Sequence, residues 1–108
     1  MPRFLFIANY APEGAQALMQ SGGSVRRSSI EKAAASLGGR VESFDFALGA
    51  DDVYVLAELP DHQAAAAMSL TVNAAGVARL RTVVLMSPEE LDSVSGLRAD
   101  YTPAGRSS

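Results

Sequence analysis

The first predicted strand of this chain, residues 4–8, is apolar on both of its faces. The run reads Phe4-Leu5-Phe6-Ile7-Ala8. Successive side chains of a strand point to opposite sides of its sheet, and a strand with two apolar faces is usually covered on both. Helices cover one side of the sheet in a small domain, so the other side needs a different partner. The run therefore predicts a sheet that is buried between its own helices and another molecule.

The order of the predicted elements is that of one α+β domain. They are a strand (4–8), a helix from residue 12 that is interrupted at 21–24 and resumes over 25–37, two strands in a hairpin (40–48 and 53–59), a helix (62–75), a strand (79–86) and a short helix from residue 88. The order β-α-β-β-α-β is the ferredoxin-like arrangement, a four-stranded antiparallel sheet with its helices on one face. Because Tyr54 and Leu56 give the hairpin an apolar outer face too, we expect two sheets to pair face to face as a homodimer.

Three local patterns make more detailed predictions. The strand over residues 40–48 alternates strictly, which places Val41 on the face opposite to Phe44. The spacing of Ser28 and Glu31 is that of a capping box, with Ser24 as a competing start of the same helix. Residues 95–108 are rich in Gly, Pro, Ser and charge. We expect them to form a C-terminal tail, separate from the domain of residues 1–94, that is flexible or docks on a partner.

Charge and composition exclude several classes of protein. Nine Lys and Arg against twelve Asp and Glu give a net charge of −3, and Arg26-Arg27 is the only adjacent basic pair. A nucleic-acid partner is therefore not expected, because duplex binding needs clustered positive charge. The absence of cysteine excludes disulfides, thiolate catalysis and cysteine-based metal centres. No apolar run reaches the roughly 18 residues of a membrane span, and no signal-peptide pattern is present, so we predict a cytoplasmic protein with no membrane partner.

Asn9, Tyr10 and His62 are the candidate catalytic residues. Asn9 and Tyr10 end the first strand, at the mouth of the space between sheet and helices, where an amide and a phenol can orient or protonate a substrate oxygen. His62 is the single histidine and follows Asp61, which suits a general base oriented by a carboxylate. The structural alternatives are a turn cap for Asn9, a half-buried Tyr10 and a solvent-facing His62 in the first turn of a helix.

Arg26, Tyr54 and Asn73 are the candidate ligand-binding residues. Arg26 follows Ser-Gly-Gly-Ser at a helix start, where backbone N–H groups and a guanidinium can hold a carboxylate or a phosphate. Its alternative role is an ion pair with an acid such as Glu31.

We expect no metal and no cofactor. A single histidine cannot form a His-rich metal site. The acids near the hairpin turn fit a solvated turn or, as an alternative, a carboxylate-only cation site; they are Asp51-Asp52 with Asp45 and Glu42.

The chain resembles the GYD-domain family over about residues 3–91. The matching motifs, in order, are Asn9-Tyr10, Pro12-Glu13-Gly14, Gly22-Gly23-Ser24-Val25-Arg26-Arg27, Leu37-Gly38-Gly39, Phe44 and Phe46 before Gly49, Leu59-Pro60-Asp61, Asn73-Ala74-Ala75-Gly76 and Pro88-Glu89-Glu90. The resemblance implies a dimeric α/β barrel, in a group that includes small isomerases, cofactor-independent monooxygenases and proteins of no assigned activity. The family typically has Tyr-Asp in the hairpin turn, whereas this chain has Asp51-Asp52, which keeps the acid and lacks the aromatic ring.

These observations favour a homo-oligomeric protein that binds a small organic or anionic ligand in the cleft between sheet and helices. One alternative is a cofactor-independent isomerase or monooxygenase-like enzyme, which we expect to bring at least three of Asn9, Tyr10, Arg26 and His62 into one pocket. Another is a purely structural or interaction module that acts through its tail.

Overall fold

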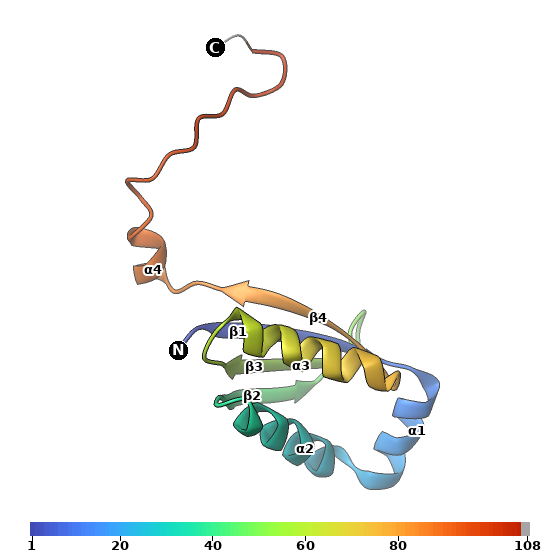
Figure 1. The fold of residues 1–108 in the computed structure, drawn as a ribbon. Helices are drawn as coiled ribbons and strands as arrows, with labels where there is room; N and C mark the ends of the chain where they lie inside the picture. The colour runs from blue at the N-terminus through green and yellow to red at the C-terminus, as the bar shows by residue number, and fades with distance from the viewer. Residues whose placement is uncertain (107–108) are drawn as a thin grey trace.

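The protein forms one four-stranded sheet with its two longest helices on one side (Figure 1). The computed structural model describes residues 1–106. Its elements are β1 (Arg3–Tyr10), α1 (Pro12–Ser21), α2 (Gly23–Ser36), β2 (Arg40–Phe46), β3 (Val53–Glu58), α3 (His62–Ala75), β4 (Ala78–Leu85) and α4 (Pro88–Asp92). The strands lie in the order β2-β3-β1-β4, and every neighbouring pair is antiparallel. This architecture confirms the predicted ferredoxin-like α+β fold.

The core lies between the sheet and helices α2 and α3. Phe4 and Phe6 of β1 are 0% and 3% exposed, and their neighbours on β3 and on the helices complete the cluster. These are Val53, Val55, Ala57, Leu59, Ala34, Ala64, Ala65 and Met68. Because the alanines of α3 give its buried side small side chains, this helix packs close to the sheet.

One strand differs from the prediction, because β2 contains a bulge. Val41 pairs with Ala57 and Phe44 pairs with Val55, and the register shifts between Val41 and Ser43. Glu42 and Ser43 of β2 thus both oppose Leu56. This extra residue places Val41 on the helix side of the sheet, together with Phe44. The prediction from strict alternation, which put these two residues on opposite faces, is wrong for this reason.

The helix ends follow local backbone chemistry. In α2, Gly38 has a φ of +83° and donates its N–H to Ala35, while Gly39 donates to Ala34, which is the hydrogen-bond pattern of a Schellman motif. The predicted starts of this helix, Ser24 and Ser28, are wrong. Both residues lie inside α2 because the chain turns at Gly22 and the helix begins at Gly23.

The face of the sheet that points away from the helices, here called the outer face, has an apolar centre. Its apolar residues, identified by the strand register, are Leu5, Ile7, Tyr54, Leu56, Val83 and Leu85. Three ion pairs surround them, and these are Arg3–Glu42, Arg40–Glu58 and Arg81–Asp51. The two-sided apolar character predicted for β1 is thus present in the folded domain.

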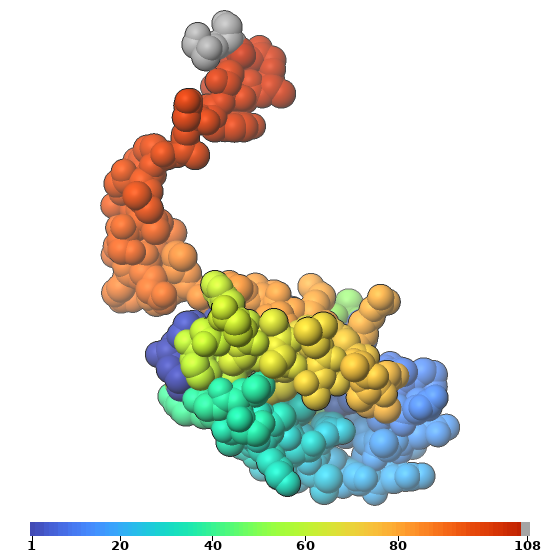
Figure 2. All heavy atoms as spheres, viewed as in Figure 1, coloured from blue at the N-terminus to red at the C-terminus, as the bar shows by residue number. Residues whose placement is uncertain are grey.

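The chain beyond α4 leaves the body of the domain. Figure 2 shows this segment, in orange and red, standing clear of the rest of the molecule, and the longest dimension of the structure is 60 Å against 32 and 23 Å for the others. The final part of the predicted tail, residues 107–108, lies outside the described residues. Within residues 1–106, no helix is long and apolar enough to cross a membrane.

Candidate functional site

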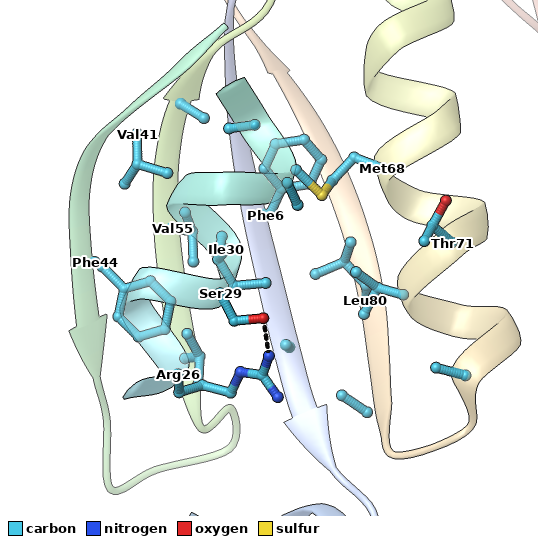
Figure 3. Close-up of a pocket in the computed structure, with 18 of the residues that line it drawn as sticks. Phe6, Arg26, Ser29, Ile30, Val41, Phe44, Val55, Met68, Thr71 and Leu80 are labelled. Carbon is cyan, nitrogen blue, oxygen red and sulfur yellow. Dashed lines mark hydrogen bonds between the residues drawn. The ribbon is translucent and has the colours of Figure 1, made fainter. Parts of the chain in front are cut away.

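A cavity of about 240 Å³ lies between the sheet and helices α2 and α3 (Figure 3). Its walls are almost entirely apolar, and they include Phe6, Ile30, Val41, Phe44, Val55, Met68, Val72 and Leu80. The polar side chains that reach it are those of Tyr10, Arg26, Ser29 and Thr71. An apolar cavity with a few convergent polar groups is the usual form of a small-molecule site.

Tyr10 reaches this cavity because it is the last residue of β1 and lies on the helix side, two residues beyond the buried Ala8. Its backbone N–H donates to Asp52 Oδ2 at 2.8 Å, which fixes the end of the strand to the hairpin loop. On the other side, Gly14 of α1 packs close to it. A Cβ on Gly14 would lie 3.0 Å from Tyr10 Cδ1 and 2.2 Å from the Val77 carbonyl oxygen. The absence of a side chain at Gly14 therefore lets α1 close over the Tyr10 ring.

Arg26 lies near the start of α2, and its side chain runs along the same cavity (Figure 3). The guanidinium donates through Nη2 to the hydroxyl of Ser29, one turn further along the helix. Its Nε is buried and has no hydrogen-bond partner among the described residues. An unsatisfied buried donor costs about 1–3 kcal/mol, and more when the group is charged. Arg26 thus brings a buried N–H donor without a partner to the lining of the cavity.

Burial raises the pKa of the Tyr10 phenol above its ordinary value, and the nearby charge of Arg26 opposes this effect. The neutral phenol is thus the form that the fold favours. Stability from this preference is complete below the unfolded-state pKa of about 10, and it is lost as pH rises through the folded-state pKa.

The titration of Tyr10 tests this environment. In a Tyr54→Phe/Tyr101→Phe variant, which leaves one of the three tyrosines, we expect the phenolate absorbance to appear at higher pH in the folded protein than in urea. Adding Arg26→Gln removes the opposing cation, so the folded midpoint is expected to move higher still. A folded midpoint at or below the one in urea contradicts the desolvated position of Tyr10.

Asn9 and Tyr54 lie on the outer face and not in the cavity. Strand β1 continues through Tyr10, so alternation points Asn9 to the side opposite to its neighbour. Asp51 holds both residues: the Asn9 amide nitrogen, oriented toward its acceptors, donates to Asp51 Oδ1 at 3.1 Å, and Tyr54 Oη donates to Oδ2 at 3.3 Å. Arg81 also donates to Oδ2, at 2.9 Å. Sequence reasoning missed this cluster, because 30 residues separate Asp51 from Arg81 and no local motif links them.

His62 and Asn73 lie away from Tyr10 and Arg26. His62 is exposed in the first turn of α3, and its ring meets the edge of Phe4 at a centroid distance of 6.0 Å. Phe4 is six residues from Tyr10, so His62 lies near the opposite end of β1, roughly 20 Å away at about 3.3 Å per residue. The Asn73 amide bonds the backbone of Leu80, accepting from its N–H at 2.7 Å and donating to its oxygen at 3.1 Å.

The acids near the hairpin do not gather into one site. Asp51 binds the cluster on the outer face, and Asp52 binds the backbone of Tyr10. Glu42 pairs with Arg3. Residues 1–106 contain no group of three His, Cys, Asp or Glu side chains placed to hold a metal ion.

The fold and the cavity together define a class: a ferredoxin-like α+β domain with a small apolar cleft between its sheet and its helices. The family model of the GYD domain matches residues 4–94. The chain therefore belongs to the GYD domain family, which confirms the resemblance seen in its motifs. No curated protein and no solved structure matches the chain significantly.

Proposed function

We propose that this protein is a homo-oligomer that binds a small organic acid in the cleft between sheet and helices. The observation that carries the proposal is the buried, unpartnered Nε of Arg26 at an apolar cavity. A carboxylate there gains a charge-assisted hydrogen bond, which is stronger than one between neutral groups. The phenol of Tyr10 lines the same cavity and supplies a second polar contact.

The size of the cavity limits the ligand. Pockets for drug-sized molecules measure roughly 300–1,000 Å³, whereas an apolar cavity of about 150 Å³ accepts benzene. The 240 Å³ here suits one ring, or a short alkyl chain, with a carboxylate attached. The apolar part of such a ligand contacts the wall of Phe6, Ile30 and Val72.

Binding is a better proposal than catalysis. Of the four residues expected to converge in an enzyme, Tyr10 and Arg26 share the cavity, while Asn9 faces the outer side and His62 lies at the other end of β1. Two polar groups are enough to orient a ligand. They do not supply the general base that a proton-transfer mechanism needs at neutral pH.

A binding experiment with small acids tests the proposal. Acetate, hexanoate, benzoate and phenylacetate are titrated calorimetrically, with 2-phenylethanol as an uncharged ligand of similar size. We expect the longer acids to bind and the alcohol to bind much less. Arg26→Gln removes a charge-assisted contact worth about 1.5–3 kcal/mol, which corresponds to roughly 10- to 100-fold weaker binding.

Arg27→Gln is the matched control, because Arg27 is the next residue of α2 and is exposed. This variant is expected to bind the acids as the unmodified protein does. The proposal is wrong if none of the four acids binds, if the alcohol binds as well as the acids, or if the two arginine substitutions have equal effects.

The oligomeric part of the proposal rests on the outer face. Its apolar centre is bordered by equal numbers of cations and anions, which are Arg3, Arg40, Arg79 and Arg81 against Glu42, Asp45, Asp51 and Glu58. A second copy of the same face thus meets balanced charge and no net repulsion. Four strands about 4.8 Å apart, with up to eight residues at about 3.3 Å each, give a face of roughly 500 Å². Two such faces reach about the 1,000 Å² expected of a biological interface.

The cytoplasmic location expected from the sequence stays a prediction.

A further inference from the structure

The segment after α4 has the sequence pattern of a β-strand, although the structure shows it unpaired. Leu97, Ala99 and Tyr101 alternate with polar residues, and Pro103 ends the pattern. The side chains of Leu97 and Tyr101 are 71% and 75% exposed. Figure 1 shows this segment extending away from the sheet, beyond β4. Residues 97–102, here called the tail segment, thus expose an apolar side to solvent.

The edge strand β4 is protected over only part of its length. Asn73 bonds both the N–H and the carbonyl of Leu80, which shows that the backbone of this residue points away from β1. Backbone groups of every second residue point the same way in an antiparallel strand, so Thr82 and Val84 also face the edge. Within residues 1–106 no strand pairs with this edge. Such an edge is a template for another strand.

A shallow apolar hollow lies beside the unprotected part of β4. Its lining comes from the start of β1, from α3 and from β4, and consists of Phe4, His62, Ala65, Ala66, Ser69, Thr82 and Val84. Of these residues, Val84 is 59% exposed. A strand added outside β4 would direct every second side chain toward α3 and cover these residues.

We propose that the tail segment of one copy adds as a fifth strand to the β4 edge of a second copy. The side of the tail that carries Leu97 and Ala99 then faces α3. Backbone pairing covers Val84 and Thr82 and ends before Leu80, whose edge-facing groups Asn73 already bonds, so Tyr101 lies beyond the paired part. An antiparallel register that sets Leu97 opposite Val84 and Ala99 opposite Thr82 also brings Asp100 opposite Arg81. The apolar pair thus forms on the helix side, and the opposite charges meet on the outer face.

The connection between β4 and the tail favours a second copy over the chain's own edge. The Ser87 and Glu90 capping box fixes the start of α4. Backbone hydrogen bonds then follow one another from Leu91 to Ser87, Ser93 to Glu89, Val94 to Leu91, Ser95 to Asp92 and Leu97 to Val94. This bonded connector spans residues 87–97 and directs the tail away from its own sheet, so the tail reaches a neighbouring copy in the conformation that the structure shows.

Disulfide trapping tests this exchange of tail segments between two copies. The chain has no cysteine of its own, so each introduced cysteine can pair only with another introduced one. A Val84→Cys chain is mixed with a Leu97→Cys chain that carries a mass tag, and the mixture is oxidised. We expect a mixed disulfide between the two chains, identified by mass spectrometry. Arg98→Cys is the matched control: it points to the other side of the tail segment and should cross-link to Val84→Cys several-fold less.

The double variant Val84→Cys/Leu97→Cys separates the two docking modes at low protein concentration. A disulfide within one chain there shows that the tail covers its own edge, which overturns the exchange. Equal yields for Leu97→Cys and Arg98→Cys, or no cross-link at all, also overturn it. The proposal does not depend on the ligand of the cleft.

Discussion

Replacing Leu5 with glutamate is expected to convert the protein from a dimer to a monomer at micromolar concentration. Leu5 pairs with Leu56 on one side and with Val83 on the other, at the centre of the outer face. It is partly exposed in the single chain, so the isolated domain tolerates a carboxylate there. Pairing of two outer faces would bury that carboxylate without a partner.

The expected loss of affinity is large because the proposed interface is symmetric and would contain the substitution twice. An uncompensated buried charge costs about 3–5 kcal/mol. Two of them weaken the dimer by more than about 10⁴-fold, at 1.4 kcal/mol for each factor of ten. Molar mass by light scattering after size-exclusion chromatography measures the change, and circular dichroism checks that the domain remains folded.

Met19→Glu is the matched control for this experiment. Met19 is 86% exposed on α1, away from the outer face, so a glutamate there should leave the dimer unchanged. An exchanged tail is not expected to rescue the Leu5→Glu dimer, because a strand of six residues, roughly 20 Å by 5 Å, covers far less area than the roughly 500 Å² of the outer face. An unmodified protein that is already monomeric, or a Leu5→Glu protein that remains a dimer, contradicts face-to-face pairing.

The arrangement of elements could be predicted because it depends on local signals. The two-sided apolar strand, the paired glycines after α2 and the caps Asp61 and Ser87 each act within a few residues, and the structure shows the expected ends at these points. The side of the sheet on which Val41 lies could not be predicted in this way. A bulge depends on how β2 pairs with β3, and the pattern of β2 alone does not contain that information.

The same distinction between local signals and contacts between distant residues applies to the candidate site. Tyr10 and Arg26 could be predicted because each lies next to the end of an element that borders the cleft. Asn9 goes to the other face because β1 continues two residues past its apolar run, and the alternation of the strand decides the side. The cluster around Asp51 depends on a contact with Arg81 between distant parts of the chain, which a single sequence does not reveal.

Replacing Gly39 with alanine is expected to destabilise the domain more than any other glycine-to-alanine change outside the cleft. A Cβ at this position would lie 2.1 Å from the Glu58 carbonyl oxygen and 2.6 Å from Leu59 Cδ2. The backbone cannot move away easily, because the Gly39 N–H bonds the Ala34 oxygen at the end of α2. Leu59 cannot yield either, since it is completely buried in the core.

The expected cost is that of overpacking against rigid neighbours, about 2–3 kcal/mol in the free energy of unfolding. For a domain of this size the loss lowers Tm by roughly 10–20 °C. Urea unfolding followed by circular dichroism measures the first quantity, and calorimetry measures the second.

Gly49→Ala provides the matched control, because no atom lies within 4 Å of a Cβ built at Gly49. This substitution is expected to change the stability by no more than about 0.5 kcal/mol. If Gly39→Ala is as stable as Gly49→Ala, then α2 and the end of β3 do not approach each other as closely as described. A difference between the two variants therefore supports the close approach of the end of α2 to the end of β3, which fixes one end of a helix that lines the cavity.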